Sequence, residues 1–119
     1  MSYDIRLIDP DTRETIQLPK HNIRGGTYAL GGTTEAWLNI TYNYGVHFER
    51  VLDEEEGIRV LYGKTVKETI PLLEKAVSLL RDDINDDYWE PTEGNARSAL
   101  MGLLELARMS PENAIWDGD

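Results

Sequence analysis

Aromatic and amide side chains gather in two short blocks of the sequence, and these residue types suit molecular recognition better than catalysis. The blocks are WLNITYNY at residues 37–44 and YWE at residues 88–90. An aromatic ring beside a hydrogen-bonding amide favours contact with a planar ligand or with an anchor residue of a protein partner. The alternative is that Trp37 and Trp89 complete a small core, as large aromatic residues usually do.

A glycine-rich segment before the first block supplies a further candidate, Arg24. The segment HNIRGGTYALGGTTE holds two Gly-Gly-Thr copies six residues apart. Glycine pairs adopt backbone conformations that other residues resist, so we expect turns that flank a short strand at residues 27–30. The backbone amides of such turns and the Arg24 cation could bind an anionic group. The candidate binding residues are therefore Arg24, Trp37, Asn39, Asn43, Tyr44, Tyr88 and Trp89.

The residue types of this chain give little indication of catalysis. Histidine is the commonest tunable base in enzymes, and the sequence holds only His21 and His47. His47 and Glu49 are two residues apart on an expected helix and so face different directions, which disfavours a shared metal or a catalytic dyad. His21 is either a ligand contact or a polar turn residue. The chain has no cysteine, which excludes disulfides, thiolate metal sites and cysteine nucleophiles. We predict a protein that is not an enzyme, with no metal and no cofactor.

The sequence Leu61-Tyr62-Gly63-Lys64-Thr65 approaches a phosphate-binding loop without completing it. A glycine, a lysine and a threonine in this order at the start of a helix close such a loop. The motif needs another glycine five positions before Gly63, where this chain has Ile58. A plain turn and helix cap is the prediction.

The segment DDINDDYWEPTEG at residues 82–94 approaches a calcium loop in the same incomplete way. The alternating oxygen ligands of such a loop are matched by Asp83, Asn85 and Asp87. The sixth position is Tyr88 instead of the glycine of the sharp turn, and the twelfth is Gly94 instead of a glutamate. We expect an acidic, solvated loop.

Acidic residues dominate the charge of the chain and are unevenly distributed. There are 22 acidic and 12 basic side chains, giving a formal net charge of −10. Such a protein repels phosphate backbones and anionic membranes, so neither nucleic acid nor a membrane is an expected partner. Residues 1–52 carry six acidic and five basic side chains, whereas residues 53–119 carry sixteen and seven. This excess of acidic residues either keeps the protein soluble or forms a surface that docks onto a basic surface of a partner.

Alternation of apolar and polar residues predicts the strands. Residues 3–9 alternate, a turn at Asp9-Pro10-Asp11-Thr12 follows, and residues 14–18 alternate again, which predicts an N-terminal β-hairpin whose second strand is ended by Pro19. Residues 37–44 also alternate. One predicted strand face carries Leu38, Ile40, Tyr42 and Tyr44, and the other carries Trp37, Asn39, Thr41 and Asn43.

Helical spacing of apolar residues predicts three helices. The first runs from residue 44 to 53, capped by Asn43 and stopped by Gly57. The second covers residues 66–81 behind a Thr65/Glu68 capping box, and Pro71 either separates its first turn or kinks it. The third spans residues 96–107.

These elements predict one α+β domain over residues 1–119, in which an N-terminal β-hairpin and a short sheet pack against two or three C-terminal helices. The apolar runs are too short to span a bilayer, and no signal segment is visible at the start. We expect a cytoplasmic protein.

The quoted blocks, together with the closing WDGD, resemble a family of small uncharacterised proteins of bacteria and their phages. The similarity rests on RGGTYALGGTTEAWLNITYNY and DYWEPTEGN and covers residues 3–119. It implies a bacterial or phage source and a cytoplasmic setting, and no catalytic residue is carried over. A phage or prophage setting would favour a small protein that binds a host factor or sequesters a nucleotide signal.

Two hypotheses of function follow. The first is a non-enzymatic interaction protein, which could be a homo-oligomer, whose acidic half and exposed aromatic residues contact a protein with a basic surface. The second is a small-ligand, nucleotide-like binder that uses Arg24, Trp37, Asn39, Asn43 and the glycines.

Overall fold

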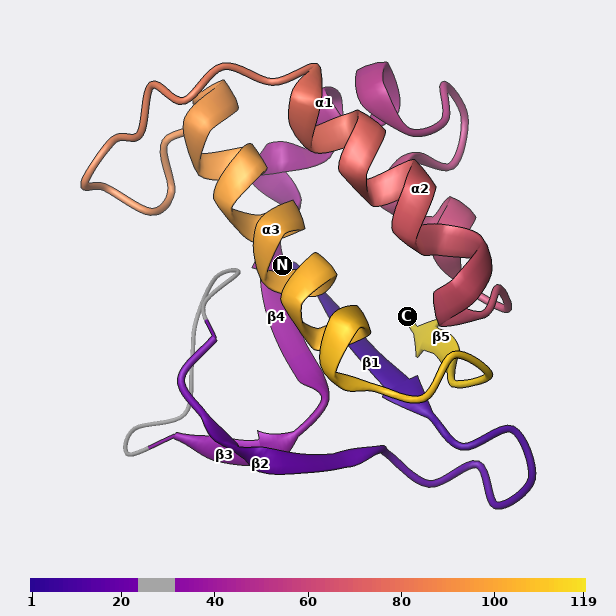
Figure 1. Cartoon of the computed structure of the whole chain (residues 1–119). Helices are drawn as coiled ribbons and strands as arrows, with labels where there is room; N and C mark the ends of the chain where they lie inside the picture. Colours follow the sequence, from indigo (N-terminus) through magenta and orange to yellow (C-terminus); the bar gives the residue numbers. More distant parts are fainter. Residues whose placement is uncertain (24–31) are drawn as a thin grey trace.

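The computed structural model describes residues 1–23 and 32–119 and has the predicted α+β architecture. Within the described residues, two small antiparallel sheets and three α-helices pack into a compact globule, in which one long helix lies across the larger sheet and a second long helix packs beside the first (Figure 1). Arg24 and the short strand expected at residues 27–30 lie outside the described residues.

The larger sheet has the strand order β4-β1-β5 and joins both ends of the described chain. It is formed by β1 (Ser2–Ile8), β4 (Trp37–Thr41) and β5 (Ile115–Gly118). Ile5 of β1 lies opposite Leu38 on one side and Gly118 on the other. The strand predicted for residues 37–44 ends at Thr41, because residues 42–44 form a 3-10 turn. Its alternation is confirmed for residues 37–40, since Leu38 and Ile40 are buried while Trp37 and Asn39 are half-buried on the other face.

The predicted N-terminal hairpin forms only at its tip. The Asp9 amide donates to the Glu14 carbonyl at 2.9 Å, and Ile8 forms a bridge with Thr15. Beyond this point the second strand no longer pairs with β1. Ala36 lies beside β1 instead, and its carbonyl accepts a hydrogen bond from the Leu7 amide at 2.9 Å. The departing strand is β2 (Gln17–His21), which pairs with β3 (Thr33–Glu35) in a second sheet.

Pro19 does not end the second strand as predicted. It lies inside β2, where the ladder with β3 is irregular between Gln17 and His21. A proline is tolerated in such a position, because an irregular edge strand does not need every backbone amide for pairing.

The first predicted helix is shorter than expected and is not capped by Asn43. A 3-10 turn η1 (Tyr42–Tyr44) precedes α1 (Gly45–Val51), and Thr41 is the cap, accepting the Asn43 amide at 3.2 Å. Asn43 therefore lies inside the helical segment. The acidic run 53–56 forms a turn, in which the Asp53 carboxylate accepts the Glu56 amide at 2.7 Å, so the helix ends before Gly57. Gly57 instead begins a second 3-10 helix, η2 (Gly57–Leu61).

Each of the two long helices begins behind a threonine N-cap, whose side chain accepts a backbone amide of the first turn. In front of α2 (Val66–Ser78), Thr65 accepts the Glu68 amide at 3.2 Å and donates to its carboxylate at 3.1 Å, which confirms the capping box. The helix continues through Pro71, so a separate first turn is wrong. The last helix, α3 (Glu93–Met109), begins three residues earlier than predicted, because Thr92 caps it.

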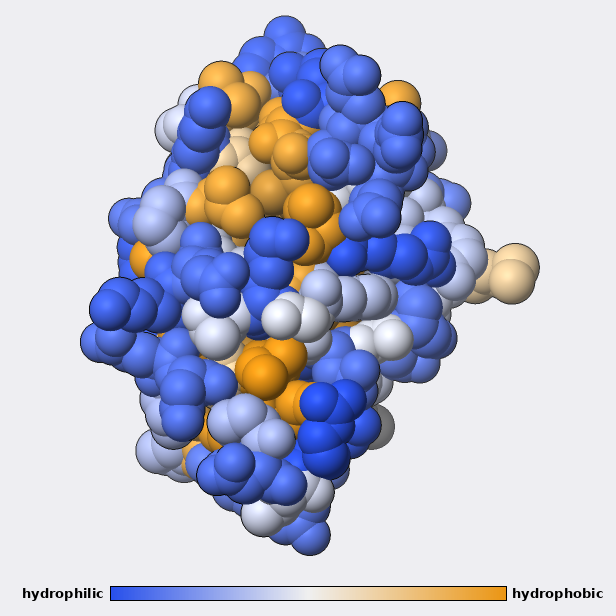
Figure 2. Space-filling model, turned by 90° about the vertical axis from the view of Figure 1, so that its right-hand side faces the viewer, coloured by the Kyte–Doolittle hydropathy of each residue, from blue (hydrophilic) through white to orange (hydrophobic). Residues whose placement is uncertain are grey.

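The core lies between the larger sheet and the helices α2 and α3. Its fully buried side chains include Ile5, Leu38, Phe48, Leu73, Leu100 and Trp116. The Trp116 indole donates to the buried Thr69 hydroxyl at 2.7 Å, which joins β5 to α2. No helix among residues 1–23 and 32–119 is long and apolar enough to cross a membrane. On the face that carries α2 and η2, hydrophobic residues show between mostly hydrophilic ones (Figure 2).

Candidate interaction site

The structure separates the candidate residues that the sequence placed in one set. Trp37 and Asn39 project from the outer face of the larger sheet, away from the helices. Asn43, Tyr44, Tyr88 and Trp89 come together at the start of α3, although the two segments lie more than forty residues apart in the sequence.

Contacts between η1 and the second aromatic block define this cluster. The Asn43 side-chain amide donates to the Trp89 carbonyl at 2.9 Å, and the Tyr44 hydroxyl donates to the Tyr88 carbonyl. The Tyr88 ring contacts the Tyr44 ring edge-on, with centroids 5.5 Å apart, and the Trp89 ring at 4.9 Å. Four of the seven candidate residues therefore lie in one cluster.

Two members of the cluster are structural. Tyr44 is buried in the core, and the Tyr88 hydroxyl accepts the Thr41 amide at 2.7 Å at the end of β4. Burial raises the pKa of both tyrosine hydroxyls above the ordinary value, so both stay neutral at physiological pH. Trp89 differs, since 55% of its surface is exposed. Neither Trp37 nor Trp89 belongs to the buried core, and the fully buried tryptophan is Trp116.

Trp89 belongs to a segment that we call the acidic loop, residues 82–90. The loop connects α2 to α3 and extends away from the body of the protein (Figure 1). It contains no lysine or arginine, and its second exposed apolar side chain is Ile84, at 63%. Its five carboxylates belong to Asp82, Asp83, Asp86, Asp87 and Glu90.

Asn95, in the first turn of α3, forms hydrogen bonds with the backbone of the acidic loop. It is 6% exposed. Its side-chain oxygen accepts the Asn85 amide at 3.0 Å, and its side-chain nitrogen donates to the carbonyls of Asp87 at 3.1 Å and Glu90 at 3.0 Å. One buried amide therefore satisfies three backbone groups of the loop, which fixes its path.

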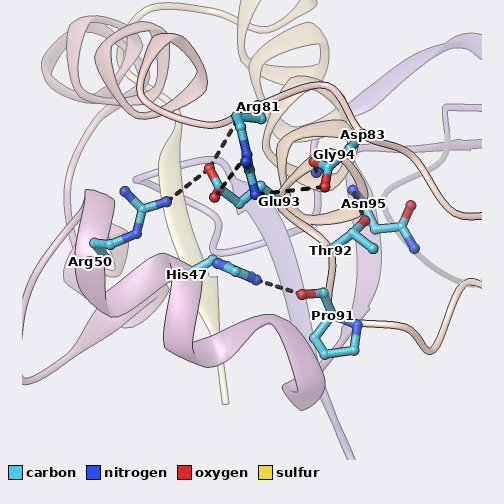
Figure 3. A network of polar contacts seen from close by, with 9 residues as sticks. All are labelled: His47, Arg50, Arg81, Asp83, Pro91, Thr92, Glu93, Gly94 and Asn95. Atoms are coloured by element: carbon cyan, nitrogen blue, oxygen red, sulfur yellow. Dashed lines mark hydrogen bonds and ion pairs between the residues drawn. The ribbon is translucent and has the colours of Figure 1, made fainter.

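Glu93 fastens the start of the loop to α3 and to α1 (Figure 3). Its carboxylate accepts the Arg81 backbone amide at 3.1 Å and forms ion pairs with Arg81 at 3.3 Å and Arg50 at 3.1 Å. The hydrogen bond from the Arg81 amide and the two arginine charges lower the pKa of Glu93 below its ordinary value. On the other side of the same turn, the His47 ring nitrogen Nε2 lies 2.6 Å from the Pro91 carbonyl (Figure 3).

Gly94 allows the loop to pack directly on the helix. A Cβ atom at this position would lie 2.5 Å from the backbone of both Asp83 and Ile84. Real Cβ contacts are never that short, so only glycine permits this approach.

Side-chain oxygens within the loop serve its own backbone. Asn85 accepts the Asp87 amide at 2.8 Å, Asp87 accepts the Trp89 amide at 3.0 Å, and Asp83 accepts the Gly94 amide at 3.2 Å. These are the three residues that matched calcium ligands in the sequence. Within the part of the chain that the structure describes, no group of three or more histidine or acidic side chains could hold a metal ion.

The Gly-Lys-Thr segment at residues 63–65 forms a turn and a helix cap. The backbone amides at the start of α2 already have partners: Val66 donates to the Ala114 carbonyl at 2.9 Å and Lys67 to the Glu112 carbonyl at 3.1 Å. The amides of Val66 and Lys67 are therefore not available to bind a phosphate.

On the outer face of the sheet, polar groups pair with one another. Arg6 lies between Trp37 and Asp117 in the strand register, and its guanidinium binds Asp117 at 3.0 Å and Thr15 at 3.0 Å. The Asn39 side chain donates to the Asp4 carboxylate at 2.9 Å. His21 is likewise engaged, with its ring nitrogen Nε2 2.8 Å from the Glu35 carbonyl between β2 and β3.

Sequence reasoning missed Asn95, Glu93 and Gly94, because the third helix was expected to start at Ala96. A signal was available in Thr92, since a threonine three residues before Asn95 is typical of a helix cap. An amide at the head of an otherwise apolar helical stripe also indicates a buried polar role.

Comparison of the chain with protein-family models, with curated proteins and with solved structures gave no match.

Proposed function

We propose that this chain is a non-enzymatic binding protein whose acidic loop docks onto a basic surface of another protein. The observation that carries the proposal is the presentation of Trp89, which is 55% exposed on a loop whose backbone is hydrogen-bonded to α3 and η1. Tryptophan is the residue type most enriched among those that dominate binding energy at protein interfaces.

The carboxylates around Trp89 favour a basic partner. Asp82, Asp86 and Glu90 make no side-chain hydrogen bond or ion pair with any residue that the structure describes. The nearest cation in the sequence, Arg81, is engaged by Glu93 at 3.3 Å. Unpaired negative charge around an apolar anchor accelerates association with a positively charged surface and selects against other surfaces.

Because the loop is already anchored, binding loses less free energy to ordering it. Ordering a flexible loop on association costs free energy, about 0.5–1.5 kcal/mol for each immobilised side chain alone. Here Asn95, Tyr44 and Asn43 already fix the backbone of residues 85–90. A partner therefore meets a preorganised surface.

The cellular setting is part of the proposal. The resemblance to small proteins of bacteria and phages supports a cytoplasmic phage or prophage accessory factor, and its partner would then be a host protein. An acidic protein with net charge −10 repels nucleic acid, which favours a protein partner.

The test is native mass spectrometry combined with affinity capture from host lysate, using the tagged full chain. We expect one protein that binds the wild type and the Trp37→Phe variant equally. Trp89→Ala should weaken its affinity by about tenfold or more, and raising the salt concentration should weaken it further. A partner that binds wild type and Trp89→Ala equally would contradict the proposal, as would a bare chain or a bare homo-oligomer.

A bound mass of several hundred daltons would instead support the small-ligand alternative. That alternative needs Arg24, Trp37, Asn39 and Asn43 in one site. Among its described members, Asn39 contacts Asp4 of β1 whereas Asn43 contacts Trp89 of the acidic loop. The structure therefore favours the protein partner.

A further inference from the structure

We infer that Trp89 is a receptor for an arginine side chain of the partner, an inference that rests on the proposed function. The partner's guanidinium stacks on the exposed indole while the neighbouring carboxylates accept its N–H groups. The combination of an aromatic face and carboxylates matches the two recognition modes of arginine, which are stacking and charge-assisted hydrogen bonding.

The indole has surface available for this contact. Tyr88 touches Trp89 at an interplanar angle of 68°, which is an edge contact instead of a parallel stack. More than half of the Trp89 surface remains exposed. Tryptophan is also the aromatic residue that attracts cations most strongly.

The protein contains a related arrangement elsewhere, in which tyrosine rings replace the indole and neutral oxygen acceptors replace the carboxylates. The Arg59 guanidinium lies 5.0 Å from the Tyr3 ring centroid and 5.5 Å from that of Tyr42. Its N–H groups donate to the Asp119 carbonyl at 2.9 Å and to the Tyr42 hydroxyl at 3.2 Å. This site shows how an arginine in this fold uses aromatic rings and oxygen acceptors together.

Among the described residues, the acidic loop has the ring and the acceptors but no cation over the ring. No described arginine or lysine lies over Trp89, and Arg81 is held by Glu93 and Asp83 instead. Three carboxylates of the loop, those of Asp82, Asp86 and Glu90, have no described partner. An arginine from another chain would supply the cation, with carboxylates as its acceptors.

Arginine fits this site better than lysine. A guanidinium is planar and more weakly hydrated than an ammonium, so it loses less hydration when it stacks on a ring. It also presents several N–H donors in one plane, which suits two carboxylates on the same loop. Lysine would be attracted by the charge of the loop without an equivalent contact to the indole.

The first experiment is an NMR titration of the isotope-labelled full chain with capped hexaarginine, hexalysine and hexacitrulline peptides. Hexaarginine should shift the Trp89 indole signal and the amides of residues 84–90 saturably, with the Trp37 and Trp116 indoles unmoved. Hexalysine should bind several-fold more weakly, and neutral hexacitrulline should not bind. Equal shifts with hexaarginine and hexalysine, or shifts centred on Trp37, would overturn the inference.

Variants separate the indole from the charge. Trp89→Leu should weaken hexaarginine binding about fivefold or more, down to the hexalysine level, while Trp89→Phe retains part of the difference. The double variant Asp86→Asn with Glu90→Gln should also weaken binding. Glu54→Gln with Glu55→Gln is its matched control, because it removes the same charge from exposed positions outside the loop. If the control weakens binding equally, the acidic charge alone is responsible and the inference fails.

The two proposals can fail separately. If a protein partner depends on Trp89 but hexaarginine does not bind there, docking stands and the arginine inference is overturned. If hexaarginine binds at Trp89 but the lysate yields no partner, the arginine receptor stands and the proposed function fails.

Discussion

The acidic loop and the outer face of the larger sheet both place a tryptophan among charged residues, but the described charges are paired on the sheet and largely unpaired on the loop. On the sheet, Arg6 neutralises Asp117 at 3.0 Å beside Trp37. On the loop, the carboxylates of Asp82, Asp86 and Glu90 have no described cation. We therefore propose the loop, and not the sheet face, as the docking surface.

The difference arises from how each region is built. On the sheet, neighbouring strands bring complementary side chains opposite one another, so Arg6 lies next to Asp117 by register. No strand among the described residues pairs with the loop. It is held through its backbone by Asn95 and Tyr44, which leaves the side chains of Asp86, Trp89 and Glu90 directed to solvent.

The largest effect is expected from Asn95→Ala, which removes the support of the loop. Three backbone groups lose a partly buried hydrogen bond, at a cost of about 3 kcal/mol in the free energy of unfolding. Urea unfolding measures this cost. Asn43→Ala is the control: it removes one exposed bond to the Trp89 carbonyl and should cost about 0.5 kcal/mol. An equal cost for both variants would show that Asn95 is not the main support.

A somewhat smaller effect is expected from Gly94→Ala. The new methyl group would collide with the backbone of Asp83 and Ile84, and the cost of about 1–3 kcal/mol outweighs the gain of about 1 kcal/mol in helix propensity. The Trp89 indole signal should also move, because the loop is displaced.

Gly63→Ala is the control for the backbone effect of replacing a glycine. Gly63 has a φ of +85° with no atom within 4 Å of an added Cβ, so alanine there adds strain without a collision. This variant should lose stability while the Trp89 signal stays unchanged. A Trp89 shift in both variants would contradict the packing role of Gly94.

Local patterns in the sequence predicted the parts of the fold that local physics decides. The Thr65 and Glu68 capping box is confirmed because its two hydrogen bonds join residues one turn apart. The alternation of residues 37–40 is confirmed because the pleat dictates it. The candidate binding residues formed one set in the sequence, but only Asn43, Tyr44, Tyr88 and Trp89 lie together in the structure.

Contacts between distant segments decided the rest. The strand β5 was not predicted. Its four residues form a strand because they pair with β1 and because Gly118 allows a close approach to the backbone of Asp4, and both contacts join distant parts of the sequence. The hairpin was extended too far because Ala36, from another part of the chain, competes for β1. Asn95 was missed for the same reason, as its partners lie in a loop without periodicity.

A smaller, pH-dependent effect is expected from Glu93→Gln. The folded protein lowers the pKa of Glu93 through the Arg81 amide and the two arginine charges. The ionised carboxylate therefore adds stability above its ordinary pKa of about 4.3, and this stability is lost as the pH falls through the lower folded pKa. Melting temperatures should show the wild type above the variant at neutral pH, with the difference disappearing in acid.

Arg50→Met tests which partner of Glu93 matters. It removes one cation but keeps the hydrogen bond from the Arg81 amide, so it should reproduce only part of the neutral-pH loss. A difference between wild type and Glu93→Gln that persists unchanged at acid pH would contradict the electrostatic role of this carboxylate.

The smallest effect is expected on the sheet face, from Arg6→Met. Both partners of the Arg6–Asp117 ion pair are more than a third exposed, so its loss should cost only about 0.5 kcal/mol, and the methionine retains the apolar stem beside Trp37. Hexaarginine binding at Trp89 should be unchanged, because the pair neutralises a surface that takes no part in docking. If Arg6→Met instead creates a second hexaarginine site beside Trp37, the free Asp117 carboxylate and the indole reproduce the arrangement of the acidic loop. The pairing of charges, and not the position of the tryptophan, would then distinguish the two regions. A loss of peptide binding at Trp89 in this variant would contradict the separation of the two surfaces.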